Sequence, residues 1–173
     1  MRFLSDRSIE MHKEHYNTLT LRYKVFEKSY PEIKDKGIRE IYRCSVPLSE
    51  KREAVRLYSD ILAHKIYFSS FGARNAVSRR VKDEYASVAS FLYLLSEECM
   101  KCREGFLLIY ENRGKISTYC GDEYDKVLLK NEALLALDLY EHAYFLDYGF
   151  DREKYVLNAI SHLDLEKIEK SAN

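Results

Sequence analysis

Asp138 and His142 stand four residues apart, with Glu141 directly before the histidine. A carboxylate and an imidazole at this spacing can both reach one metal ion if the chain turns from a strand or loop into a helix between them. One oxygen and one nitrogen ligand together favour manganese, iron or zinc over copper(I) or calcium. The alternative is a surface histidine at the start of a charged helix, because this spacing alone is common.

The run of residues 138–144 resembles the D-x-W-E-H-A-Y signature of the iron/manganese superoxide dismutase family, with Tyr140 at the tryptophan position. Two further histidines extend the resemblance. His12, in residues 8–12, is similar to the histidine of the family's S/T-x-E-x-H motif, and His64 resembles that of its N-H-x-x-[FY]-[FW] motif. The resemblance therefore implies four metal ligands, which are His12, His64, Asp138 and His142.

The resemblance implies a superoxide dismutase that converts superoxide to dioxygen and hydrogen peroxide. In this family one iron or manganese ion per chain is alternately oxidised and reduced. Members separate the two metals mainly by residues around the ligands that this chain has replaced, so both metals stay open. Two alternatives also stay open: a metal-binding relative with weak or lost dismutase activity, and a helical protein whose histidines are incidental.

Asp60 stands where many family members carry a glutamine against the solvent molecule on the metal, four residues before the second histidine ligand. The other place for that glutamine, just after a hairpin strand, falls near Gly121. Burial and the nearby Asp138 carboxylate are expected to raise the pKa of Asp60 if it points into the site. The alternative is an acidic residue on the helix surface.

The family's funnel histidine and gateway tyrosine fall on Tyr16 and Thr20, four and eight residues after the first ligand. Its pocket tryptophans are replaced by Phe106, Leu108 and Tyr140. The ligand set is therefore complete, whereas the residues expected to tune it are changed.

Glu141 implies a homodimer, since in the family this glutamate accepts a hydrogen bond from a ligand histidine of the other subunit. The alternative is a solvated glutamate at a helix start. A second family interface pair falls on Tyr16 and Phe145, and Phe145 lacks the hydroxyl. Besides the ligands, the candidate catalytic residues are Tyr16, Asp60, Glu141 and Tyr144, the last residue of the 138–144 run.

Residues 8–30 are expected to form a long helix that brings His12 to an apolar face. Ser8 can cap it, and apolar side chains from Met11 onward recur at intervals of three and four residues. Pro31 ends the pattern.

Residues 49–68 show the same period and predict a second helix, with Glu53 placed to help cap it. Residues 32–47 are expected to connect the two helices. Two antiparallel helices with one histidine each form a hairpin, so residues 1–72 are predicted to be an N-terminal helical hairpin lobe.

In the second half of the chain, the spacing of apolar residues changes from the helical period of about 3.6 to one closer to 2, which is typical of strands. Residues 105–111 and 115–119 predict two strands joined by a turn at 112–114, and residues 133–138 predict a third, buried strand that ends at Asp138.

The remaining segments favour helices. Residues 74–100 predict several short ones, and further helices are expected at 141–148, 152–160 and 163–170. The predicted fold is α+β, in which residues 73–173 form a C-terminal lobe with a three-stranded antiparallel sheet flanked by helices.

Length and composition limit the number of domains and the classes of partner. The chain has 173 residues, enough for one domain or two small lobes, with 28 basic and 28 acidic residues and a formal net charge of +0. Nothing in this balance argues for a nucleic-acid or membrane partner, and none is expected. The small-molecule substrate that the resemblance implies is superoxide. The opening residues lack an apolar signal segment, so a cytoplasmic location is expected.

Cys99 and Cys102 form a CxxC pair, with Cys120 the nearest further cysteine. A structural zinc site would need a second ligand pair. We expect partly buried, reduced thiols instead.

Overall fold

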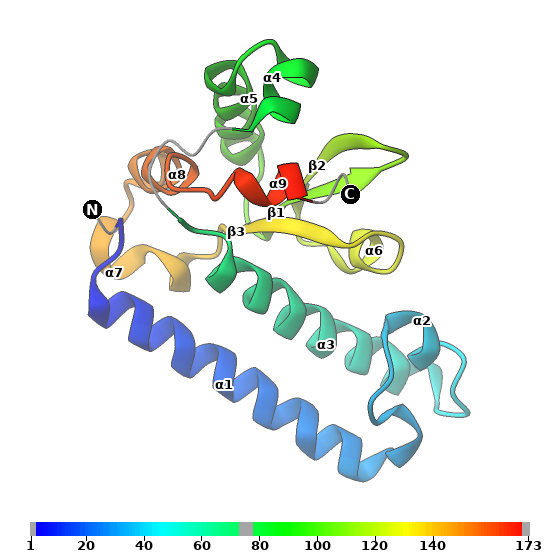
Figure 1. Cartoon of the computed structure of the whole chain (residues 1–173). Coiled ribbons are helices and arrows are strands. Elements are labelled where there is room, and N and C mark those ends of the chain that lie inside the picture. The colour runs from blue at the N-terminus through cyan, green and yellow to red at the C-terminus, as the bar shows by residue number, and fades with distance from the viewer. Residues whose placement is uncertain (1–2, 73–77, 171–173) are drawn as a thin grey trace.

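The computed structural model describes residues 3–72 and 78–170 and has the predicted α+β architecture (Figure 1). Two long antiparallel helices, α1 (Asp6–Ser29) and α3 (Leu48–Ser69), form a hairpin on one side of a three-stranded sheet. Helix α3 lies between α1 and the sheet, where it packs against β3. Within the described ranges, none of the helices combines the length and apolar character needed to span a bilayer.

Helix α1 begins two residues earlier than predicted. Ser5 is its N-cap and accepts a hydrogen bond from the Ser8 amide at 3.1 Å, so the predicted cap at Ser8 is wrong. Met11 is also not on the inner face, because 49% of it is exposed. The face that turns toward α3 instead carries His12, Leu19 and Tyr23, all buried.

Helix α3 follows Pro47, which occupies the N-cap position without a side-chain hydrogen bond. The predicted capping role of Glu53 is wrong, since Glu53 lies inside the helix. Its carboxylate forms ion pairs with Arg56 at 3.0 Å and with Arg22 of α1 at 3.4 Å. The connection between α1 and α3 contains two short helical segments, η1 (Pro31–Ile33) and α2 (Ile38–Ile41).

The sheet has the order β2-β1-β3 with antiparallel neighbours. The strands are β1 (Phe106–Asn112), β2 (Lys115–Gly121) and β3 (Ala133–Asp138), close to the predicted ranges. Arg113 and Gly114 connect β1 to β2 with φ values of 52° and 76°, the left-handed conformations of a tight hairpin turn. In register, Phe106 pairs with Gly121 on one side and with Asp138 on the other.

Gly105 fixes the end of the sheet that carries Asp138. Its φ is +118°, and a Cβ atom there would lie 2.0 Å from the carbonyl oxygen of Gly121. Its own carbonyl accepts a hydrogen bond from the Leu139 amide at 2.9 Å. Only glycine allows this close approach, which holds the start of β1 against the residue after Asp138.

The other side of the sheet is covered by helices. Helices α4 and α5 pack against β2, and α8 packs against α5. Their bounds, with those of the remaining helical segments, are α4 (Arg79–Tyr85), α5 (Val88–Lys101), α6 (Asp125–Leu128), η2 (Glu141–Ala143), α7 (Phe145–Tyr148), α8 (Arg152–Ile160) and α9 (Glu166–Lys170).

Four of these segments differ from the predictions. The helix expected at 141–148 is a 3-10 turn followed by a one-turn helix, α6 was not predicted, and α9 begins three residues later than expected. Part of the predicted helical region 74–100 lies in 73–77, outside the described residues. The division into lobes at residue 72 stays a prediction.

Candidate metal centre

Four side chains from four separate elements converge between the hairpin and the sheet. His12 comes from α1, His64 from α3, Asp138 from the end of β3 and His142 from η2. One ligand atom of each lies within 4.8 Å of the others. The Oδ2 atom of Asp138 is central, at 3.1 Å, 3.5 Å and 3.0 Å from the Nε2 atoms of the three histidines in chain order.

Hydrogen bonds behind the site orient two of these side chains. The Nδ1 atom of His64 lies 2.7 Å from the carbonyl oxygen of Asp60, one helical turn earlier, and this bond turns Nε2 toward the centre. The Oδ1 atom of Asp138 accepts a hydrogen bond from the Tyr140 amide at 2.9 Å. The hydroxyl of Tyr155, fully buried, donates to the Asp138 carbonyl at 2.7 Å.

The charges in the site suit a cation. Burial by itself raises the pKa of Asp138, but the imidazoles of His12 and His142 outweigh it, so the pKa lies below its usual range and the carboxylate is ionised. Burial lowers the pKa of His64 to about 4, which leaves this imidazole neutral at pH 7.

Unpartnered nitrogen atoms point to the same conclusion. Both ring nitrogens of His12 and the Nε2 atom of His64 are buried and have no hydrogen-bond partner among the described residues. Although His12 Nε2 is close to Asp138, it lacks hydrogen-bonding geometry there. Buried polar atoms without partners are costly, and a metal ion would give these nitrogens one. The donor set, three imidazoles and a carboxylate, fits iron, manganese or zinc.

Residues 73–171 match the family model of the C-terminal domain of iron/manganese superoxide dismutases, which covers more than half of the chain. The chain belongs to the iron/manganese superoxide dismutase family. The candidate ligands Asp138 and His142 lie within the matched region, and the family's use of iron or manganese agrees with the donor set.

Two curated relatives support this membership. The chain is 23% identical over 175 residues to the chloroplastic iron superoxide dismutase 2 of Oryza sativa subsp. japonica, covering 93% of this chain and 67% of the relative. It is 26% identical over 114 residues to an iron superoxide dismutase of Cupriavidus metallidurans, covering 61% of this chain and 58% of the relative. The chain thus spans about two thirds of the first relative and somewhat over half of the second.

Asp60 and Tyr124 form a pair where dismutases of this family were expected to place a glutamine. The Tyr124 hydroxyl donates to Asp60 Oδ1, and Arg56 approaches Asp60 Oδ2 at 3.4 Å. Only 14% of the Asp60 side chain is exposed, so it is not a solvated surface acid. Burial raises the pKa of both partners. Tyr124 was not predicted, because nothing in the sequence links it to a residue in α3.

His15 is a fourth histidine at the site, which the sequence analysis missed. Its ring centroid lies 4.3 Å from that of His142 and 5.4 Å from that of His64. Burial, reinforced by the imidazole of His142, lowers the pKa of His15. Its position three residues after His12, on nearly the same face of a helix, was the available signal.

Tyr16 and Thr20, the predicted funnel and gateway positions, differ from each other in their surroundings. Tyr16 lies at the edge of the site, with its ring centroid 6.3 Å from that of His64. The Thr20 hydroxyl donates to the carbonyl of Tyr16 at 3.0 Å, so it is occupied by its own helix.

Two of the three positions at which the resemblance predicts tryptophan carry aromatic rings beside the candidate ligands. Phe106 lies edge-on to His64 with centroids 5.2 Å apart, and Tyr140 stacks on His142 at 5.7 Å. Leu108 is fully buried in β1. Tyr144 is buried one layer behind the ligands, where it stacks on Tyr155 at 4.7 Å.

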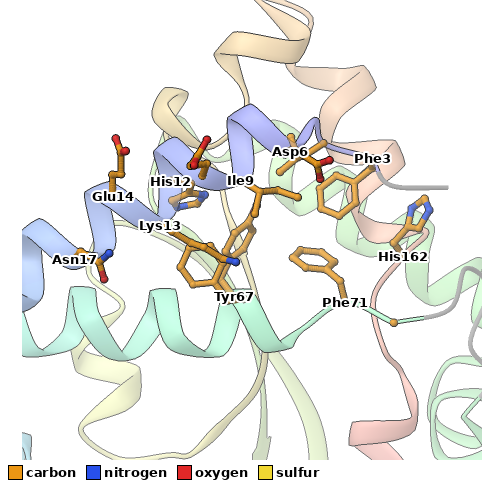
Figure 2. A pocket seen from close by; sticks show the side chains of 14 residues that line it. Phe3, Asp6, Ile9, His12, Lys13, Glu14, Asn17, Tyr67, Phe71 and His162 are labelled. Atoms are coloured by element: carbon orange, nitrogen blue, oxygen red, sulfur yellow. The ribbon is translucent and has the colours of Figure 1, made fainter.

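A cavity of about 950 Å³ borders the site on the side of His12. Figure 2 shows His12, Lys13 and Ile9 of α1 on one side of it and Tyr67 of α3 with Phe71 on the other. Of the four candidate ligands, His12 alone lines this cavity. The cavity therefore borders one candidate ligand, His12. His142 instead reaches the surface, with 33% of its side chain exposed.

Proposed function

We propose that this chain is a superoxide dismutase that binds one iron or manganese ion. The observation that carries the proposal is the convergence of three histidines and one aspartate, with unpartnered ring nitrogens, in a member of the iron/manganese superoxide dismutase family. When bound, the ion supplies the alternating one-electron chemistry that turns superoxide into dioxygen and hydrogen peroxide. The names of the two relatives support the same activity.

The chain's own residues set the charge of the centre. His12, His64 and His142 would hold the ion through nitrogen and Asp138 through oxygen. Asp138 neutralises only one unit of charge, so a divalent or trivalent ion leaves the site positive. Superoxide is an anion and is attracted to this charge, and His142 lies where the site meets the surface.

The Asp60–Tyr124 pair is the proposed proton-holding unit. Peroxide formation consumes two protons, and burial raises the pKa of the Asp60 carboxyl, so it keeps a proton to higher pH than an ordinary aspartate. Because the Asp60 carbonyl also binds His64, the pair is attached directly to a ligand. Asp60→Gln should therefore change both the dismutation rate and the reduction potential. Unchanged kinetics and potential would remove Asp60 from the proposed machinery.

Metal analysis of protein purified without added metal, together with a superoxide-consumption assay, tests the function. Wild-type protein should hold about one iron or manganese per chain, and His64→Ala or Asp138→Ala should each abolish stoichiometric metal. His162→Ala is the control, because His162 is buried but its Nδ1 atom lies 2.8 Å from the Asn158 carbonyl, outside the cluster. Full metal occupancy with an unaltered spectrum in His64→Ala would contradict the ligand assignment.

A second candidate function is metal binding with weak dismutation. It is favoured by the replacement of the expected glutamine with the Asp60–Tyr124 pair and by the absence of tryptophan from the sequence. Full metal occupancy with superoxide consumption no faster than in the metal-free protein would select this function over the first.

A homodimer completes the proposal. Glu141 is exposed, and its carboxylate has no partner within the described residues. Beside it Phe145, Leu146 and Phe150 are 46%, 52% and 89% exposed, which is unusual for neighbouring large apolar side chains. We expect this face to bind a second copy, with Glu141 accepting a hydrogen bond from a ligand histidine across the interface.

Light scattering and metal analysis of Glu141→Ala test the dimer. The substitution should loosen the dimer and lower metal occupancy together, whereas Glu153→Ala, an exposed glutamate on α8, should change neither. A monomeric wild-type protein with a full metal site would refute the role of Glu141 across an interface.

A further inference from the structure

The segment that leads into α1 is hydrogen-bonded to α7, the short helix that follows η2. The amide of Ser5, the N-cap of α1, donates to the Oδ2 atom of Asp147 at 2.7 Å. The Tyr148 hydroxyl donates to the carbonyl of Phe3. Asp147 and Tyr148 both belong to α7, which lies beside the start of α1 in Figure 1. We call these two side chains the α7 clamp.

Apolar packing holds the same segment but does not fix its direction. Leu4 is 6% exposed and belongs to the main hydrophobic core. The Phe3 ring lies against that of Phe71, with centroids 4.7 Å apart, as Figure 2 shows. Burial of apolar surface is non-directional, whereas hydrogen bonds weaken steeply when their angles change. The α7 clamp therefore decides how the segment lies relative to α7.

The charge of Asp147 strengthens its part of the clamp. Burial by itself raises the pKa of Asp147, but the hydrogen bonds from Ser5 outweigh it, so the pKa lies below its usual range. The carboxylate is therefore ionised at neutral pH, and an ionised acceptor forms the stronger hydrogen bond. Its negative charge also lies at the positive end of the α1 dipole. Asp147 thus supports the start of α1 both through a hydrogen bond and through its charge.

The clamp joins the elements that carry two of the candidate ligands. His12 lies in α1 seven residues after Ser5, a distance of about 10 Å along the helix axis. His142 lies in η2, directly before α7, and η2 packs against α1. The rings of His12 and His142 meet edge to face, with centroids 5.0 Å apart. A shift or tilt at the start of α1 would therefore move His12 away from His142.

We propose that Asp147 and Tyr148 are positioning residues that hold His12 at its place beside His142 and thereby slow the release of the metal ion. This inference rests on the proposed metal binding. Of the four candidate ligands, His12 is the one that α1 carries. The other long helix keeps its place without the clamp, because α3 packs directly against β3. Loss of the clamp should therefore weaken the bond from His12 first.

Transfer of cobalt(II) from the loaded full chain to excess EDTA tests the proposal. Cobalt(II) is the probe because its visible absorption reports the geometry of its ligands. Tyr148→Phe and Asp147→Ala should each speed cobalt release about threefold, and the double variant about tenfold, as expected for the loss of one and of two hydrogen bonds. All three should also change the cobalt spectrum. Asp147→Asn keeps an acceptor oxygen and should restore most of the wild-type rate and spectrum.

Two matched controls remove similar bonds at a helix that carries no candidate ligand. The Glu169 carboxylate accepts hydrogen bonds at the start of α4, from Ser78 Oγ at 2.8 Å and from the Arg80 amide at 3.1 Å. The Tyr85 hydroxyl donates to the carbonyl of Ile116 at 3.1 Å. Glu169→Ala and Tyr85→Phe should lower the urea midpoint as the clamp variants do, and leave the rate of cobalt release and the spectrum unchanged.

The outcomes separate this inference from the dismutase proposal. Cobalt release that accelerates equally in Asp147→Ala and Glu169→Ala would overturn the positioning role and leave only a contribution to stability. A wild-type spectrum and rate in the double variant would overturn it as well. Wild-type protein that binds cobalt but consumes no superoxide when loaded with iron or manganese would refute the dismutase and leave the clamp as inferred. Wild-type protein that takes up no cobalt would overturn both.

Discussion

Replacing Tyr124 by phenylalanine removes the hydroxyl that donates to Asp60 and leaves the ring in place. The Asp60 side chain is 14% exposed, so little water can replace the lost donor. Arg56 stays 3.4 Å away, but 54% of its side chain is exposed and it compensates weakly. A hydrogen bond to a charged group contributes about 1.5–3 kcal/mol. We therefore expect Tyr124→Phe to lower the free energy of unfolding by about 2 kcal/mol at pH 7.

Unfolding of the metal-free protein by increasing urea, at one fixed protein concentration, measures this change. With a denaturant slope of about 2 kcal/mol per molar, the midpoint should fall by about 1 M. Tyr23→Phe is the matched control, because the Tyr23 hydroxyl is buried but has no hydrogen-bond partner among the described residues. Its loss should change stability by less than about 0.5 kcal/mol, or increase it.

The cost of Tyr124→Phe should also depend on pH. The hydroxyl favours the ionised form of Asp60, so its contribution is present above the pKa of Asp60 and is lost as pH falls below that pKa. Burial raises this pKa above 3.8, so the loss begins at a higher pH than for an exposed aspartate. Equal losses in Tyr124→Phe and Tyr23→Phe, or a loss that does not shrink in acid, would refute this account of the pair.

Two further predictions concern the sheet and the ligands. Gly105→Ala should destabilise the chain by more than about 3 kcal/mol in urea unfolding, because its Cβ would meet the Gly121 carbonyl. Gly114→Ala, with open space around it, should cost only about 1–2 kcal/mol. Equal effects of the two substitutions would contradict the close approach at Gly105. In thermal unfolding, the metal-free protein should lose stability as pH falls from 6.5 to about 4. Over this range the His64 side chain is protonated in the unfolded chain but stays neutral in the folded one, because burial lowers its pKa. A flat stability profile over this range in wild type would contradict the neutral state of His64.

Sequence periodicity predicted the regular elements well. The third strand at 133–138 and the helix at 152–160 have the predicted bounds, because each is a short run with a clear period and a defined end. The start of α1 was misplaced because Ser5 and Ser8 are both good caps, and only the fold chooses between them. The helix expected at 141–148 breaks into two pieces within a run whose sequence alone would permit a continuous helix.

The four proposed ligands could be named from motifs, and the structure brings them together. Their surroundings could not be predicted in the same way. Tyr124 reaches Asp60 because it is the N-cap of α6, which packs against α3, a tertiary contact with no signal in local sequence. His15 was overlooked because the family pattern directed attention to Tyr16, one position further along the helix.

The four proposed ligands come from both ends of the chain, since His12 lies in the first helix and His142 near the last ones. During synthesis the histidines of the hairpin emerge long before Asp138, and two imidazoles alone make a weak and unselective site. If these residues bind the ion as proposed, high-affinity loading waits until β3 has docked against α3, late in folding. Because the ligand atoms themselves discriminate poorly between iron and manganese, the ion captured at that moment should follow whichever metal the growth medium supplies in excess.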